Sequence, residues 1–202
     1  MPEIADLRQA LIDVGRRFDA RGWVAAGGGN FSARLDARTA LVTASGPHKG
    51  LLTPGDFVAV DIDSGTCNAG KPSYETGLHL AVYRRLPDVG AVLHTHGPAA
   101  TRISRRDGKN VVLRGYEVQK ALPGAPDPAR TCTVPVFDND QDIARLAGRL
   151  ETRLRSEPLL AGCLIAGHGL YAWGTTVAQA RNRVEALEFM FQCELDEEQV
   201  KP

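Results

Sequence analysis

Residues 89–97 read VGAVLHTHG, a short apolar run that ends in two histidines, His94 and His96. Side chains two residues apart on a β-strand lie on the same face, with their Cα atoms about 6.5 Å apart. Two imidazoles at the end of a buried strand can therefore converge on one metal ion. A His-x-His pair also arises by chance, with both rings simply hydrogen-bonded at a strand end, so the pair alone does not establish a metal site.

A third histidine, His168, has a similar setting. Residues 163–174 read CLIAGHGLYAWG, in which an apolar run is followed by a histidine between two glycines. Flanking glycines let the backbone approach a ligand closely or adopt a positive φ. Catalytic zinc is typically held by three protein ligands, with Zn–N distances of about 2.0 Å, and keeps one position open. His94, His96 and His168 therefore predict a zinc site with one ion per subunit.

The composition argues against several classes of protein. The chain of 202 residues has 24 basic and 24 acidic residues, so its formal net charge of zero predicts no general attraction to nucleic acid or to a membrane surface. Its four cysteines are widely spaced and form no CxxC pair, which argues against a disulfide scaffold and against a thiolate zinc site. Charged residues interrupt the N-terminal segment, and no apolar run approaches the roughly 20 residues that span a bilayer. We expect a cytoplasmic protein with a single domain over residues 1–202.

Apolar periodicity predicts that helices and strands alternate along the chain. Besides the strands that end near the histidine motifs, strands are expected at residues 31–35, 40–44, 56–62, 111–113 and 132–137. Helices are expected at residues 3–20, from residue 72 or 73 onward, and at residues 98–106, 141–157 and 176–194. The Asp-Asn-Asp segment at residues 138–140 is expected to cap the helix that begins at residue 141. The last helix carries Phe189 and Met190 outside its core-facing stripe, which indicates a second partner such as another subunit.

Two glycine-containing loops and one helix start predict a phosphate site. Gly27–Gly29 expose backbone N–H groups that can cradle an anion, although an ordinary flexible turn is the simpler explanation of this run alone. Residues 43–50 read TASGPHKG and combine hydroxyls, free N–H groups and one cation, a mixture that phosphate sites favour. Ser73 stands at an expected helix N-terminus, where N–H groups and the helix dipole attract anions. The candidate phosphate-binding residues are Asn30, Ser45, Gly46, Lys49 and Ser73.

Two glutamates are candidate acid–base groups. Glu75 lies in the first turn of its expected helix, and as an isolated acid it is explained by the helix dipole alone. Glu117 follows the strand expected at residues 111–113, in the segment GYEVQKAL. Of the two remaining histidines, His79 lies one helical turn after Glu75 and is expected to be a packed or capping side chain. His48 is expected to be a loop residue and not a ligand.

Five motifs follow one another along the chain in the order GGNFS, TASGPHKG, KPSYE, LHTHG and AGHGLYAWG. In sequence and order they resemble the class II aldolase/adducin family over essentially the whole chain. The resemblance implies a three-layer α/β/α sandwich with a largely antiparallel central sheet, a homotetramer, and zinc held by three histidines. It matches the zinc ligands to His94, His96 and His168, the phosphate contacts to Asn30, Ser45, Gly46 and Ser73, and the aldolase acid–base glutamate to Glu75.

Further segments are similar to a dehydratase branch of this family that acts on a ketose 1-phosphate: SGPHKG, GYEVQKAL, VPVFDNDQDIARLA, GHGLYAWG and EALEFMFQCEL. In that branch Glu117 matches the acid–base residue, so we expect Glu117 to act as the base and Glu75 to assist it, with the opposite assignment still open. Tyr74 stands where many aldolases have a second serine, which puts one phosphate donor in question. The alternatives are a sugar-phosphate aldolase or 4-epimerase, and a non-catalytic adducin-like interaction domain, against which the three histidines argue.

Overall fold

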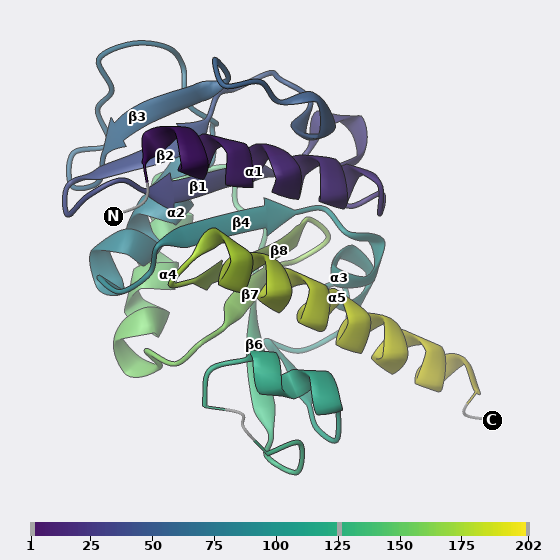
Figure 1. Cartoon of the computed structure of the whole chain (residues 1–202). Helices are drawn as coiled ribbons and strands as arrows, with labels where there is room; N and C mark the ends of the chain where they lie inside the picture. The colour runs from purple at the N-terminus through teal and green to yellow at the C-terminus, as the bar shows by residue number, and fades with distance from the viewer. Residues whose placement is uncertain (1–2, 125–126, 201–202) are drawn as a thin grey trace.

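The chain folds around an eight-stranded sheet that is covered by helices on both faces (Figure 1). The computed structural model describes residues 3–124 and 127–200. The strands lie in the order β3-β2-β1-β4-β8-β7-β6-β5, and neighbouring strands are antiparallel except for the parallel pair β6 and β7. The expected three-layer sandwich with a largely antiparallel sheet is confirmed.

The strands are short and mostly buried, because helices cover both faces of the sheet. The central strand β4 is buried over its whole length, which explains why its sequence is a continuous apolar run rather than an alternating one. The bounds of the strands are β1 Asn30–Arg34, β2 Thr39–Thr43, β3 Phe57–Asp61, β4 Ala91–Thr95, β5 Asn110–Leu113, β6 Cys132–Phe137, β7 Gly162–Ile165 and β8 Gly169–Gly174.

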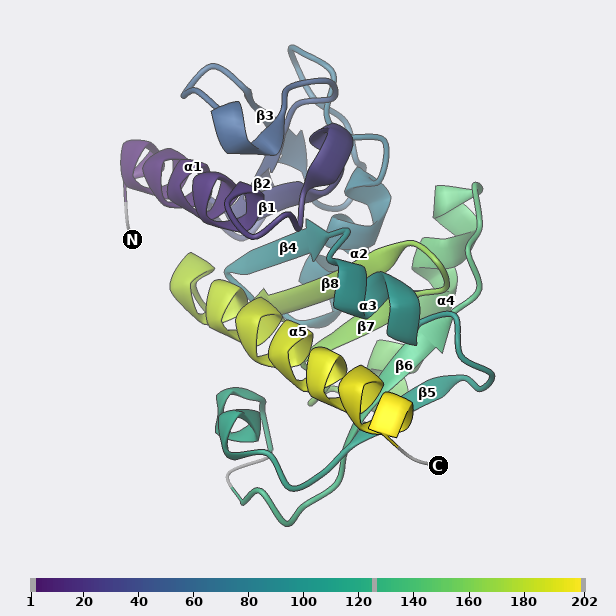
Figure 2. The same ribbon diagram turned by 90° about the vertical axis from the view of Figure 1, so that its right-hand side faces the viewer.

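The helices divide between the two faces of the sheet (Figure 2). Helices α1, α3 and α5 pack on one face around one apolar cluster, and α2 and α4 pack on the other face around a second cluster. Their bounds are α1 Ile4–Asp19, α2 Thr76–Arg85, α3 Pro98–Ile103, α4 Ile143–Ser156 and α5 Val177–Val200, with short 3-10 helices η1 Ala25–Gly27, η2 Lys49–Leu51 and η3 Glu117–Ala121. Within the described residues, no helix is long and apolar enough to cross a membrane.

Helix α2 begins at Thr76, later than the sequence predicted, because the residues before it pair with the end of β2. The N–H of Ser73 donates to the carbonyl of Thr43 at 3.0 Å, which keeps this segment extended. Glu75 is consequently the N-cap residue and does not lie in the first turn. The same pairing holds Ser73 beside the loop that carries Ser45.

The loop before α4 is also longer than predicted. The carboxylate of Asp142 accepts the N–H of Arg145 at 3.0 Å, so Asp142 caps the helix and residues 138–140 do not. Asp140 instead receives hydrogen bonds from the guanidinium groups of Arg145 and Arg149. Residues 139–141 therefore stay outside the helix and are available to line a pocket.

Helix α5 extends to Val200, beyond the predicted end at residue 194. Its Met190 is fully buried in the core of its own chain, so the prediction that this side chain faces a second partner is wrong. Phe189, in contrast, is 55% exposed. Of these two residues, only Phe189 therefore lies off the core-facing side of the helix.

Strand β4 brings the histidine motif to one end of the sheet. Asn30 pairs with His94 across β1 and β4, and Thr95 pairs with Leu170 across β4 and β8. His168 lies in the tight turn between β7 and β8. The C-terminal end of β4, the start of β1 and the β7–β8 turn thus meet at a single place, and this is where the polar side chains gather.

Candidate active site and metal centre

Three imidazoles converge at this end of the sheet. The Nε2 atoms of His94 and His96 lie 2.9 Å apart, those of His96 and His168 lie 3.0 Å apart, and those of His94 and His168 lie 3.3 Å apart. Two nitrogen ligands of one tetrahedral zinc ion, each at about 2.0 Å from it, are separated by about 3.3 Å. The three nitrogens are therefore spaced as ligands of a single ion, and the residues fit a metal site.

Contacts with the protein hold His94 in the orientation a ligand needs. Its Nδ1 donates to the carbonyl of Leu170 at 3.0 Å, which leaves Nε2 free to bind a metal. The ring also stacks on Tyr171, with centroids 3.9 Å apart. Burial, assisted by the two neighbouring imidazoles, lowers the pKa of His94 well below its usual range, and burial lowers the pKa of His96 to about 4. Both rings are neutral at pH 7, the form that binds metals.

Glu75 completes the cluster. Its Oε2 lies 3.4 Å from Nε2 of His94, and its Oε1 lies 3.2 Å from Nε2 of His168. The amide of Asn30 donates to Oε2 at 2.7 Å, which fixes one side of the carboxylate. The ligand atoms of these four metal-ligating side chains all lie within 4.8 Å of one another. A carboxylate at this distance can bind the same ion or move protons beside it.

The glycine run before β1 is packed directly against the histidines. A Cβ at position 28 would come within 2.4 Å of Nδ1 of His96, and one at position 29 would come within 2.6 Å of the carbonyl oxygen of His94. Gly29 also has a φ of +77°, which disfavours any other residue. The run is therefore not an ordinary flexible turn, because two of its glycines are needed for the loop to approach the metal site.

A buried cation lies beneath this loop. Lys49 is 4% exposed, and its Nζ donates to the carbonyls of Gly27 at 3.1 Å and Pro47 at 2.6 Å. Burial lowers the pKa of Lys49, and the two carbonyls hold its side chain in place. Its positive charge remains available to attract an anion into the adjacent pocket.

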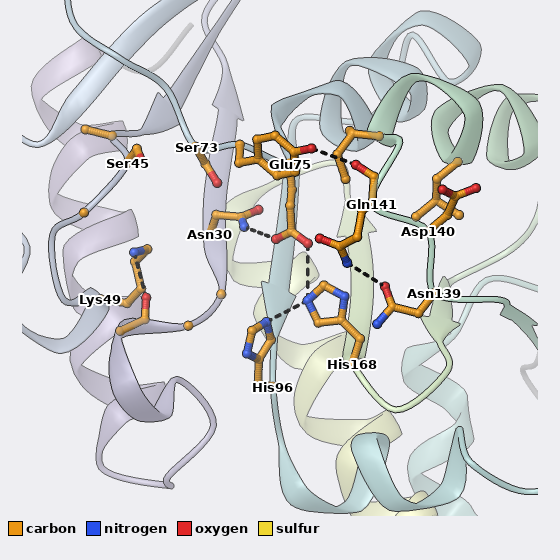
Figure 3. A pocket seen from close by; sticks show the side chains of 18 residues that line it. Asn30, Ser45, Lys49, Ser73, Glu75, His96, Asn139, Asp140, Gln141 and His168 are labelled. Atoms are coloured by element: carbon orange, nitrogen blue, oxygen red, sulfur yellow. Dashed lines mark hydrogen bonds and ion pairs between the residues drawn. The ribbon is translucent and has the colours of Figure 1, made fainter.

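The pocket has a volume of about 300 Å³ and joins the two loops to the histidines. Figure 3 shows Ser45, Lys49 and Ser73 on one side, Glu75 and the histidines in the middle, and residues 139–141 on the other side. The predicted site residues that line it are Asn30, Ser45, Gly46, Lys49, Ser73, Glu75, His96 and His168, with His94 buried behind them.

The comparison of the sequence with known families agrees with this geometry. The sequence model described as "Class II Aldolase and Adducin N-terminal domain" matches residues 9–195. The chain belongs to the class II aldolase and adducin family.

Within this family the chain is similar to proteins of two activities. It is 49% identical over 191 residues to a methylthioribulose-1-phosphate dehydratase from Serratia proteamaculans, with 93% of each chain covered. It is 50% identical to the dehydratase of the same name from Pseudomonas paraeruginosa, covering 94% of this chain and 93% of the relative. Among solved structures it is similar to L-fuculose-1-phosphate aldolase from Thermus thermophilus, with a TM-score of 0.81, 27% identity, and coverage of 98% and 97%.

One predicted site residue, Glu117, does not lie in this pocket. Glu117 begins η3, its side chain is 76% exposed, and it forms an ion pair with Lys120. Helix η3 packs against α5, where the carbonyl of Ala121 accepts a hydrogen bond from Arg183. Within one chain, Glu75 is therefore the glutamate that meets the histidines, and Glu117 is not part of that pocket.

Residues 139–141 also line the pocket and were not predicted as site residues. Residues 138–140 read Asp-Asn-Asp and were predicted to cap a helix that begins at Gln141, because this sequence before an apolar stripe is typical of a cap. In the structure, Tyr74 donates from its hydroxyl to the carbonyl of Gln141 at 2.7 Å and connects this segment to the N-terminal end of α2. Tyr74 thus forms a pocket wall rather than replacing the second serine as a phosphate donor. In the sequence, only the run of polar residues before α4 indicated that this segment could line a site.

Proposed function

We propose that this chain dehydrates 5-methylthioribulose 1-phosphate to 2,3-diketo-5-methylthiopentyl 1-phosphate, a step of methionine salvage. One observation carries the proposal: relatives named methylthioribulose-1-phosphate dehydratase share about half of the residues along nearly the whole chain. The cluster of Glu75 with three histidines supports it, because such a cluster suits a metal-assisted reaction at a ketose.

The metal we propose is zinc, one ion per subunit, held by His94, His96 and His168. Neutral imidazoles suit zinc, and the cluster keeps a side open toward the pocket. Zinc bound there supplies a Lewis acid for the C2 carbonyl and the C3 hydroxyl of the substrate, which makes the proton on C3 easier to remove.

For the phosphate group we propose the opposite side of the pocket. The hydroxyls of Ser45 and Ser73, the backbone at Gly46 and the amide of Asn30 line it, and Lys49 adds a positive charge. Hydroxyls, N–H groups and one cation together are typical of phosphate sites. Binding the phosphate there directs the rest of the sugar phosphate toward Glu75 and the histidines.

Dehydration requires proton transfer at two carbons, followed by tautomerisation. The C3 proton is removed, and the C4 hydroxyl leaves with one proton as water. The resulting enol takes up a proton at C4 and loses the proton of its C3 hydroxyl, which gives the diketone. We assign the C3 proton to Glu117 of a neighbouring subunit, since Glu117 lies outside the pocket of its own chain, and the proton on the leaving hydroxyl to Glu75. This assignment requires an oligomer, and we propose a cytoplasmic homotetramer.

The test is incubation of metal-analysed protein with 5-methylthioribulose 1-phosphate, followed by mass spectrometry. We expect zinc in the protein and a product lighter than the substrate by one water, with no smaller carbon fragments. No change in the substrate, with zinc bound at one ion per subunit, would contradict the proposal and direct the search to other ketose phosphates.

A second candidate is a sugar-phosphate aldolase or 4-epimerase. The similarity to L-fuculose-1-phosphate aldolase favours it, since the same side chains can assist cleavage of the C3–C4 bond when the C4 hydroxyl proton is removed instead. Cleavage of the substrate into two carbon fragments in the same experiment would establish this alternative. A folded oligomer that binds no zinc and alters no ketose phosphate would instead indicate a non-catalytic interaction domain of the adducin type.

A further inference from the structure

His79 is a buried histidine that the metal site does not use. It lies on α2, one turn after Glu75, and none of its surface is exposed. Its Nδ1 lies 2.7 Å from Oγ of Ser32, and its Nε2 lies 2.5 Å from Oδ1 of Asn30. Burial lowers the pKa of His79 to about 3, so the ring is neutral at pH 7 and carries a proton on one nitrogen only.

The partners decide which nitrogen carries that proton. Oε2 of Glu75 is 2.7 Å from Nδ2 of Asn30, and because a carboxylate only accepts, Asn30 must direct its NH₂ group toward Glu75. The amide oxygen of Asn30 then faces His79, and because this oxygen also only accepts, Nε2 of His79 must be the protonated nitrogen.

The other half of the chain of hydrogen bonds follows from this tautomer. Nδ1 of His79 has a lone pair and accepts the hydroxyl proton of Ser32. Oγ of Ser32 in turn lies 2.8 Å from the hydroxyl of Tyr83, which donates to it. Tyr83 is 2% exposed and Ser32 is fully buried, so neither has water as an alternative partner. Four donors therefore point the same way, from Tyr83 through Ser32, His79 and Asn30 to Glu75.

This direction matters because the two ends of an amide are nearly equal in size and differ only in hydrogen bonding. An Asn30 amide turned by 180° would present its oxygen to the Glu75 carboxylate, and the hydrogen bond that holds the carboxylate would be lost, because both groups only accept. The N–H of His79 opposes that rotation, because it has no acceptor unless the Asn30 oxygen faces it.

We propose that His79 is a positioning residue that, by donating from Nε2 to Asn30, orients the amide that holds Glu75 and faces the substrate phosphate. The hydroxyl of Ser32 supplies the donor that the unprotonated Nδ1 accepts in this tautomer. The inference rests on the proposed function for its kinetic consequence, though not for the hydrogen-bond direction itself. The alternative is that His79 only fills the core beside Tyr171, whose ring centroid lies 5.7 Å away.

The hydrogen-bond direction is tested without metal or substrate. Nitrogen-15 NMR of metal-free protein labelled in the histidine rings is expected to show His79 neutral from pH 5 to 8, with the proton on Nε2 and a bare Nδ1. Ser32→Ala should shift the Nδ1 resonance, and Asn30→Ala should speed exchange of the Nε2 proton. A proton on Nδ1 of His79, or resonances that neither variant moves, would overturn the inference whatever the enzyme does.

The positioning role is tested by kinetics with 5-methylthioribulose 1-phosphate. His79→Leu removes the donor at similar volume, whereas His79→Gln retains an N–H near the position of Nε2. We expect His79→Leu to lower kcat/KM about 10- to 100-fold at unchanged zinc content, and His79→Gln to recover most of the loss. In an Asn30→Ala background, His79→Leu should cause no further loss, because its effect passes through Asn30.

Equal losses in the two His79 variants, or a loss that adds fully to that of Asn30→Ala, would mean that His79 has only a packing role. If His79→Leu does not fold, Ser32→Ala serves in its place, with a smaller loss that is likewise absent in the Asn30→Ala background. Failure of the proposed function is recognised separately, since the unaltered protein would then dehydrate nothing while the NMR result still decides the hydrogen-bond direction.

Discussion

Gly28 lies directly against the ring of His96, where an added Cβ would come within 2.4 Å of Nδ1. The backbone of Gly28 has φ −63° and ψ 170°, which any residue adopts, so only the lack of space excludes a side chain. We expect Gly28→Ala to displace the ring and weaken zinc binding about 10- to 100-fold, measured by metal analysis after dialysis against a chelator. Gly55→Ala, whose nearest neighbour would be 3.8 Å away, should bind zinc normally.

Removal of a metal-binding side chain should abolish function without unfolding the chain. His96→Ala deletes one of three converging nitrogens at the end of β4, beyond the strand itself. We expect no retained zinc and no dehydration, with a circular dichroism spectrum like that of the metal-free parent protein. Normal turnover by a variant shown to be free of zinc would refute the site assignment.

Both glutamates should be needed for proton transfer. We expect Glu75→Gln and Glu117→Gln each to keep zinc and to lower kcat about 10²- to 10⁴-fold, since each would remove a proton-transfer group. A large loss in Glu75→Gln together with a negligible loss in Glu117→Gln would assign both proton transfers to Glu75.

Subunit mixing tests whether Glu117 acts across a subunit boundary. Mixed oligomers of Glu117→Gln with His96→Ala should recover part of the activity, because a Glu117→Gln subunit keeps its histidines and can receive Glu117 from its neighbour. Mixing Glu75→Gln with His96→Ala is the matched control. Glu75 and His96 line the same pocket of one chain, so no recovery is expected. Recovery in neither mixture would contradict the role of Glu117 in trans.

Lys49 should contribute to phosphate binding rather than to proton transfer. Its buried ammonium group lies beneath the glycine loop, next to the hydroxyl-lined side of the pocket. We expect Lys49→Met to raise KM about tenfold or more with a small change in kcat, and to weaken inhibition by inorganic phosphate, because a charged contact to phosphate is lost. Lys109→Met, in the exposed turn just before β5, should change neither constant. A loss confined to kcat would exclude this role.

The metal-free protein should lose stability as the pH falls. Burial lowers the pKa of His79 to about 3 and that of His96 to about 4, below the usual value of 6.5. At a pH between the lowered native pKa of such a histidine and 6.5, its unfolded form binds more protons than its native form. The free energy of unfolding therefore falls with falling pH. Each such histidine contributes a slope of about 1.4 kcal/mol per pH unit. Urea unfolding at pH 7, 6 and 5 measures it, and His79→Gln should make the dependence shallower. An unchanged slope in that variant would show that His79 does not contribute.

Much of the fold followed from local patterns in the sequence. The first helix, the paired strands around residue 36 and the strand at residues 132–137 were predicted to within one or two residues, since apolar periodicity and turn residues are local properties. The starts of α2 and α4 were placed too early. At α2 the backbone of Ser73 pairs with Thr43, a contact between segments far apart in the sequence that no local pattern reveals.

The sequence by itself determined the donor set of the site. His94, His96 and His168 stand at the ends of apolar runs, and their type and position selected them, whereas Glu75 was selected by the resemblance of its motif to the family. Only the tertiary structure decided how they are used. The convergence of the Nε2 atoms, the exclusion of Glu117 from its own pocket and the orientation of Asn30 by His79 depend on contacts across the sheet. Hydrogen-bond direction is a property of pairs, and pairs brought together by folding are not adjacent in the chain.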